Sequence, residues 1–132
     1  MQPRGYRNNN PGNIRLSRDH WQGLAEEQND DSFFQFETMA YGFRAMLKIL
    51  QNYHKKHGCR TISDYIRRWA PANENNTTAY IKSVCTALQV PSDFVLNIND
   101  RSVMIPLAYA IARHENGEKP IIKDIEEAWE LL

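Results

Sequence analysis

The chain has 132 residues, of which 42% are hydrophobic and 11% are aromatic, a length that supports one hydrophobic core and is short for two. Lys plus Arg and Asp plus Glu each number 16, so the overall composition gives no electrostatic attraction to nucleic acids or anionic membranes. No apolar run reaches the roughly 18 residues of a membrane span, and the N-terminal segment lacks the apolar region of a signal peptide. These features predict a single domain over residues 1–132 that stays in the cytoplasm as synthesised and binds neither nucleic acid nor membrane.

The N-terminal quarter of the chain is rich in turn formers and short apolar stretches. "RNNNPGNIR", residues 7–15, contains four Asn, one Pro and one Gly. Between residues 13 and 37, aromatic and β-branched stretches such as "NIRL" and "FFQFE" flank the polar "EEQNDD". This alternation predicts a small antiparallel β-hairpin, which helices would have to cover.

Apolar residues at helical spacing predict about five helices in the rest of the chain. The expected helices cover residues 40–57, 61–70, 79–90, 100–114 and 121–132. The first ends in a basic turn before Gly58, as a helix with a glycine cap does. The predicted fold class is therefore α+β, mainly helical, with one N-terminal hairpin.

Several kinds of chemistry lack their usual motifs. The two cysteines, Cys59 and Cys85, show neither CxxC spacing nor a histidine set of zinc type, so free thiols are expected unless the fold brings the pair together. Nucleotide-binding glycine motifs, GxSxG and HExxH are all missing. No metal or organic cofactor is implied. The basic segment "YHKKHGCR", residues 53–60, complements a helix dipole, or alternatively docks an acidic partner.

The asparagine-rich loop admits two interpretations. Asn and Gly suit left-handed turn conformations, so the loop can be a turn and nothing more. Asn side chains also offer both donors and acceptors, which suits hydroxyl-rich and acetamido-rich ligands such as glycans. Trp21, in "WQG", is in the same way either a core residue or a platform on which a sugar ring stacks.

Three carboxylates stand where helix formation does not explain them: Glu37 after "FFQF", Glu74 in "PANENNT" and Glu115 in "ARHENG". A carboxyl at a helix C-terminus, such as that of Glu115, faces the negative end of the helix dipole, which favours its protonated form. A general acid that cleaves a glycosidic bond needs that form. The alternatives are a solvated side chain at a fraying helix end for Glu115, and a loop or capping role for Glu74.

A second polar cluster surrounds Glu74. It consists of Asn73, Asn75, Asn76, Thr77 and Tyr80. Two amide-rich clusters in one small domain suggest two sides of one cleft.

Longer stretches of the sequence resemble a known family. "RGYRNNNPGNIR", "WQG", "FFQFETMAYGFRAMLKILQNY" and "TISDYIRRWAPANENNTTAYIKSV" resemble a family common in phages and prophages and described as virion structural proteins. This resemblance covers residues 4 to about 90. It implies a protein that is associated with the virion, with other virion proteins as partners.

A weaker resemblance concerns the lysozyme-superfamily glucosaminidases. In that family a helix ending in Ala-x-x-Glu-Ser-Gly carries the general acid and comes just before a block similar to "NNPGNIR", "WQG" and "FFQFE". Here "PLAYAIARHENG", residues 106–117, resembles that helix, so the order is circularly permuted. The resemblance implies a lysozyme-like domain with Glu115 as general acid. It also implies a saccharide groove lined by Asn9, Asn10, Asn13 and Trp21.

The predicted function is therefore a phage peptidoglycan glycan-strand hydrolase or lytic transglycosylase, delivered to the cell wall or carried by the virion. The second catalytic group is Glu37, Glu74 or Tyr80, and Asn75, Thr77 and Tyr80 contact substrate. Asn116 replaces the family's Ser and no second carboxylate is assigned, so retaining, inverting and lyase outcomes stay open. The alternative function is a non-catalytic virion structural or cell-wall-binding module.

Overall fold

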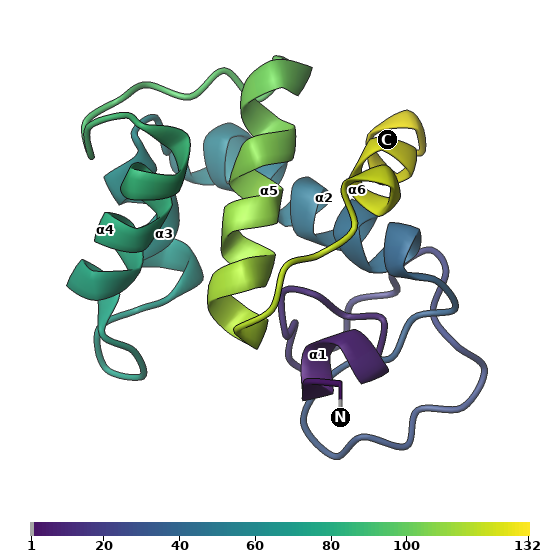
Figure 1. The fold of residues 1–132 in the computed structure, drawn as a ribbon. Helices are drawn as coiled ribbons and strands as arrows, with labels where there is room; N and C mark the ends of the chain where they lie inside the picture. Colours follow the sequence, from purple (N-terminus) through teal and green to yellow (C-terminus); the bar gives the residue numbers. More distant parts are fainter. Residues whose placement is uncertain (1) are drawn as a thin grey trace.

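The computed structural model describes residues 2–132, so residue 1 of the predicted domain lies outside it, and it contains six helices in that range (Figure 1). The helices are α1 (Arg4–Arg7), α2 (Met39–His57), α3 (Ile62–Trp69), α4 (Thr77–Leu88), α5 (Arg101–Asn116) and α6 (Ile122–Glu130). The helices predicted from apolar spacing are present as α2 to α6. None of the described helices is long and apolar enough to cross a membrane.

The predicted N-terminal β-hairpin is wrong, and with it the α+β class and the lysozyme-like hairpin domain. Within residues 2–132 there is no strand. Only isolated bridges occur in this range, and they pair Arg15 with Phe33, Leu24 with Phe36, and Thr61 with Val95. The described chain is therefore helical with a long irregular loop. Alternating aromatic residues do occur in the N-terminal loop, and single backbone hydrogen bonds cross it, such as that from the Phe34 N–H to the Ile14 carbonyl. Side-chain groups, such as the Asn10 amide and the Asp30 carboxylate, bind other backbone groups there, so no continuous ladder forms.

Local capping explains where the helices begin and end. Thr61 and Asp64 form a reciprocal capping box at the start of α3, and the backbone N–H groups of Thr61 and Arg60 lower the pKa of Asp64. Helices α2 and α5 both end at a glycine in the left-handed conformation, Gly58 and Gly117, with φ of 66° and 71°. Capping signals in the sequence therefore set these boundaries.

Helix α5 is central to the packing. It lies between α3 and α4 on one side and α6 on the other, and α2 runs behind it (Figure 1). Helix α2 packs along α6, and α4 packs along α5. The largest fully buried side chains come from all of the long helices: Tyr65, Tyr80, Phe43, Met46, Leu47, Leu50, Ile62, Ile66, Met104, Leu107, Ile111 and Ile125. Burial of these apolar surfaces is the main stabilisation of the helical body.

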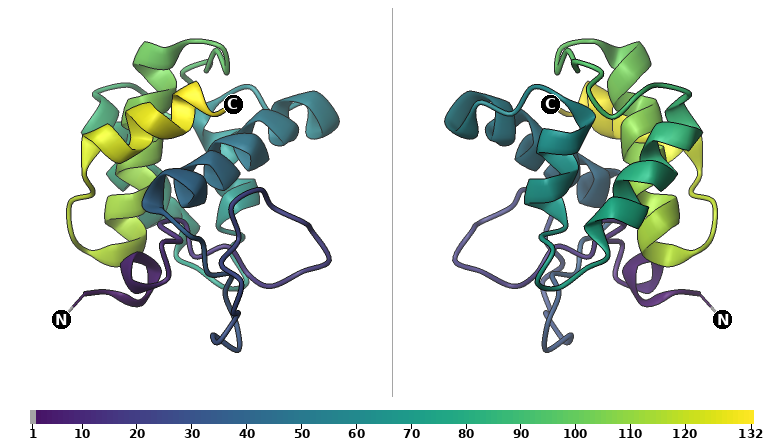
Figure 2. Two further views of the ribbon diagram at one scale, coloured as in Figure 1. Left: turned by 90° about the vertical axis from the view of Figure 1, so that its right-hand side faces the viewer. Right: turned by 90° about the vertical axis from the view of Figure 1, so that its left-hand side faces the viewer.

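A second, smaller apolar cluster attaches the N-terminal loop to α2. It contains buried Phe34, Phe36 and Ala45, with Trp21 and Tyr41 among the partly buried residues around them. The loop extends from the helical body on the side where α1 lies (Figure 2).

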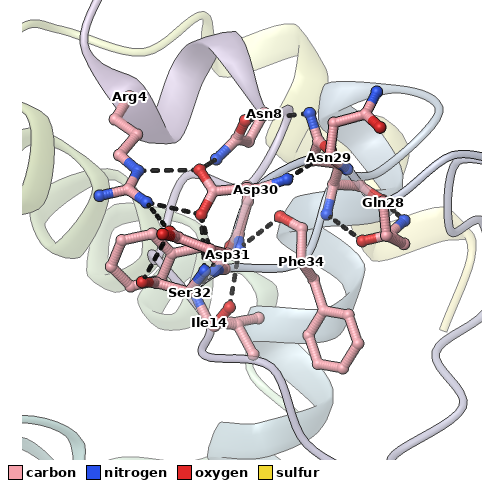
Figure 3. Close-up of polar contacts among 12 residues, drawn as sticks. Arg4, Asn8, Ile14, Gln28, Asn29, Asp30, Asp31, Ser32 and Phe34 are labelled. Carbon is pink, nitrogen blue, oxygen red and sulfur yellow. Dashed lines mark hydrogen bonds and ion pairs between the residues drawn. The ribbon is translucent and has the colours of Figure 1, made fainter.

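One carboxylate, Asp30, organises the outer part of this loop. Arg4 donates two hydrogen bonds to it, at 2.8 and 2.6 Å, and the Asn8 amide donates a third at 2.9 Å (Figure 3). The backbone N–H groups of Ser32 and Phe33 also donate to Asp30. The Arg4 guanidinium and these further donors hold the pKa of Asp30 well below its usual range.

We expect Asp30→Asn to lower the melting temperature at neutral pH, and this difference from wild type to shrink in acid. The folded state keeps Asp30 ionised at pH values where the unfolded state, with a pKa of about 3.9, already binds a proton. The stabilisation is therefore complete above about pH 5 and is lost as the pH falls toward the folded-state pKa. Thermal unfolding of both proteins between neutral pH and pH 3 measures this.

The matched control is Asp31→Asn, because the Asp31 side chain is 91% exposed and shares only one contact with Arg4. Its effect on the melting temperature should be smaller at every pH. A difference between wild type and Asp30→Asn that stays constant from neutral pH to pH 3 would contradict the prediction.

Candidate functional site

A groove of about 370 Å³ lies where the N-terminal loop meets the helical body. Its walls come from the N-terminal loop, α2, the end of α3, the loop between α3 and α4, and the last turn of α5. The lining residues are Gly12, Asn13, Ile14, Arg15, Phe33, Ile49, Tyr53, Arg68, Trp69, Ala70, Pro71, Glu74, Asn75 and Glu115. Polar and aromatic side chains thus share one concave surface.

Glu115 is half-buried on the last turn of α5, and both of its carboxylate oxygens accept hydrogen bonds. The Asn13 amide donates to Oε1 at 3.1 Å, and the Tyr80 hydroxyl donates to Oε2 at 2.8 Å. Burial and the neighbouring Glu115 carboxylate raise the pKa of Tyr80 far above its ordinary value, so Tyr80 keeps its proton and acts as the donor. The carboxyl group is therefore fixed in orientation from the N-terminal loop and from α4.

The end of α5 also clamps the N-terminal loop in place. The Asn116 amide donates to the carbonyl oxygens of Pro11 and Ala112, each at 2.9 Å. A Cβ on Gly5 would collide with the Oδ1 atoms of Asn116 and Asn13. Only a glycine lets α1 approach the end of α5 this closely, and this approach brings Asn13 to Glu115.

A second hollow continues the groove on the other side of Glu115. It measures about 340 Å³ and shares Asn75 and Glu115 with the groove. Tyr80 and His114 also line it, with their rings stacked at a centroid distance of 3.8 Å. Glu115 is therefore accessible from both hollows.

The structure brings together five of the residues predicted from sequence: Asn13, Glu74, Asn75, Tyr80 and Glu115. Asn13, Glu74, Asn75 and Glu115 line the groove, and Tyr80 lines the second hollow and bonds Glu115. The two polar clusters, which lie far apart in the sequence, meet at one cleft.

Two other asparagines of the loop lie outside the groove lining. The Asn9 amide donates to the carbonyl oxygen of Phe36 at 3.1 Å, and Asn9 has a positive φ of 51°. Asn10 is fully buried, and its amide donates to the carbonyl oxygens of Ile14 and Phe34. Both side chains fix the loop rather than face the cleft.

Trp21, Glu37 and Thr77 also lie outside the groove lining. Trp21 packs into the small apolar cluster with Phe34 and Phe36. Glu37 is exposed just before α2, and its backbone N–H donates to the carbonyl oxygen of Gly23.

Thr77 is 5% exposed, and its hydroxyl donates to the carbonyl oxygen of Ala70. The Asn76 side chain caps α4, so Glu74 does not have that capping role.

The sequence interpretation missed several of the lining residues, among them Arg15, Arg68 and Trp69. Trp69 is half-buried and lies so close to Gly12 that a Cβ there would meet its ring at 2.7 Å. The signal available in the sequence was an Arg-Trp pair at the end of a helix, directly before the polar "PANENN" loop. Helical periodicity placed Arg68 and Trp69 at the end of a helix and gave no sign that they line a groove.

Metal and thiol chemistry have no assembled site in the described part of the chain. Residues 2–132 contain no group of three or more His, Cys, Asp or Glu side chains that could hold a metal ion. Cys59 and Cys85 are both free, and burial raises the pKa of each thiol. A raised thiol pKa disfavours the reactive thiolate.

Comparison with known proteins identifies the family. No family model matches the chain. The chain is 38% identical over 124 residues to Protein P5 of Pseudoalteromonas phage PM2, a match that covers 92% of this chain and 76% of that protein. The chain belongs to the Protein P5 family. The resemblance to a phage protein family is thus confirmed.

In this Protein P5 family member, the hydrogen bond from Tyr80 to Glu115 should contribute measurably to stability. Tyr80→Phe removes the donor and leaves a half-buried carboxylate oxygen without a partner, so we expect the free energy of unfolding to fall by about 1–3 kcal/mol. Urea unfolding followed by circular dichroism measures it.

Tyr109→Phe is the matched control, because Tyr109 is half-buried on α5 and its hydroxyl forms no hydrogen bond within residues 2–132. Its free energy of unfolding should change by less than about 0.5 kcal/mol. Equal destabilisation by the two variants would show that the Tyr80 hydroxyl contributes nothing specific.

Proposed function

We propose that this chain cleaves the glycosidic bonds of peptidoglycan glycan strands, with Glu115 as the carboxylic general acid. The observation that carries the proposal is the fixed Glu115 carboxyl at the junction of two hollows, where both predicted polar clusters meet.

The composition of the groove supports a saccharide ligand. Aromatic side chains (Phe33, Tyr53 and Trp69) line it beside the amides of Asn13 and Asn75. Aromatic rings stack on the apolar faces of sugar rings, while amides donate to and accept from their hydroxyl and acetamido groups. A volume of about 370 Å³ falls within the range of small-molecule sites.

In the proposed reaction, Glu115 gives a proton to the glycosidic oxygen, and the bond to the departing sugar breaks as positive charge develops on the sugar ring left behind. Each carboxylate oxygen has two acceptor positions, and the donors from Asn13 and Tyr80 occupy one position on each oxygen. The remaining positions are available for the proton that is transferred. Asn13 and Tyr80 act as positioning residues.

Glu74 is the candidate for the second catalytic group. It is exposed, and it is the carboxylate besides Glu115 among the described residues that line the groove. It would act as a general base toward an attacking water molecule. Tyr80 suits that role poorly because its raised pKa disfavours the phenolate, and Glu37 lies outside the groove lining.

The alternative function is a non-catalytic virion structural or wall-binding module that keeps the same groove. One observation favours it: both oxygens of Glu115 accept hydrogen bonds, from Asn13 and Tyr80, so the carboxyl also has a structural role in joining α5 to the N-terminal loop and to α4. The relationship to a phage protein fits this alternative and gives no evidence of hydrolase activity.

Glu115→Gln should lower the rate at which muropeptides are released from purified peptidoglycan on the order of 10²–10⁴-fold, because an amide cannot supply the proton. The products are measured by mass spectrometry after reduction, which also identifies the cleaved bond. Glu26→Gln, in an exposed part of the N-terminal loop outside the groove lining, should cleave at the wild-type rate.

Binding of peptidoglycan by wild type and Glu115→Gln alike, with no products from either, would refute the enzyme and establish the binding module.

A further inference from the structure

Two arginines line the groove from different walls. Arg15 comes from the N-terminal loop and Arg68 from the end of α3. The side-chain ion pairs within residues 2–132 join Arg4 to Asp30 and Asp31, and Arg101 to Glu126. Neither Arg15 nor Arg68 has a carboxylate partner in this part of the chain, although the groove contains two carboxylates, Glu74 and Glu115.

An aromatic ring of the groove supports each of these guanidinium groups. The Cζ atom of Arg15 lies 5.6 Å from the ring centroid of Phe33, and that of Arg68 lies 5.6 Å from the ring centroid of Tyr53. A guanidinium over a ring face is held by cation–π attraction and keeps its N–H edge free. Such an edge matches the two oxygens of a carboxylate.

The groove carries charges of both signs, because Arg15 and Arg68 line it together with Glu74 and Glu115. Glu115 also adjoins the hollow that contains Tyr80 and His114. Arg68 also adjoins a depression of about 350 Å³ lined by His57, Asp64 and Arg67. Beyond the groove, the proposed proton donor and Arg68 therefore border different hollows.

We propose that Arg15 and Arg68 bind a carboxylate of the ligand, so that the groove selects an anionic, carboxylate-bearing glycan over a neutral one. This inference rests on the proposed function for the glycan backbone and adds the charge that is recognised. Peptidoglycan offers two sources of carboxylate: the lactyl group of a muramic acid residue without a peptide, and the stem peptide on a substituted one. A glycan made only of N-acetylglucosamine offers neither.

The test measures binding by calorimetry in a Glu115→Gln background, so that no ligand is cleaved. The ligands are three glycan fragments of equal length: one with stem peptides, one stripped of peptides to expose lactyl carboxylates, and a neutral chitooligosaccharide. Arg15→Gln and Arg68→Gln should each weaken binding of a carboxylate-bearing fragment on the order of tenfold. Binding of the chitooligosaccharide should stay unchanged.

Comparison of the first two fragments identifies the carboxylate, because only the recognised one will show the dependence on Arg15 and Arg68. Arg18→Gln is the matched control, since Arg18 is an exposed arginine of the same loop outside the groove lining. It should bind all three fragments as the background protein does. Thermal unfolding of each variant shows that the fold is retained.

Equal weakening for neutral and carboxylate-bearing fragments would overturn the inference, and so would binding that ignores both arginines or binding of none of the fragments. The two proposals fail separately. Cleavage by wild type without any dependence on Arg15 and Arg68 would leave the enzyme and remove the carboxylate recognition. Binding that depends on the two arginines, without cleavage by wild type, would remove the enzyme and leave the carboxylate recognition.

Discussion

The side-chain amide of Asn10 holds the N-terminal loop in the shape on which the groove depends. It is fully buried, donates to the carbonyl oxygens of Ile14 and Phe34 at 3.0 and 2.9 Å, and accepts from the Ile14 N–H at 2.9 Å. These bonds add to the few backbone hydrogen bonds that cross the loop, such as that from the Phe34 N–H to the Ile14 carbonyl. Since each unsatisfied buried polar group costs about 1–3 kcal/mol, the loop has one strongly favoured conformation, and it presents Asn13 and Arg15 to the cleft.

Contacts between residues far apart in the chain complete the cleft. Asn13 reaches Glu115 because Gly5 has no Cβ to obstruct the end of α5. Tyr80 approaches the same carboxyl from α4, which packs along α5. The orientation of Glu115 therefore depends on the packing of the whole domain, and changes remote from the cleft can alter its chemistry.

Family membership and site chemistry answer different questions. The relationship to Protein P5 of Pseudoalteromonas phage PM2 places the chain in a phage family without specifying a reaction. The cleft supplies the chemical argument: a positioned carboxyl, aromatic and amide walls, and two arginines that form no ion pair with any carboxylate of residues 2–132. An enzyme and a wall-binding module would share the walls and the arginines. They differ in whether Glu115 transfers a proton.

Local sequence determined the helices, because apolar spacing and caps such as the Thr61–Asp64 box act over a few residues. It also marked Glu115 and both polar clusters as candidates. It could not tell Asn10 from Asn13, since identical side chains in one loop differ only in what surrounds them: backbone carbonyls for Asn10, and Glu115 for Asn13. Nor could local sequence show that Arg15 and Arg68 line the same groove. Only the tertiary structure decided these roles, because each depends on a neighbour supplied by a distant part of the chain.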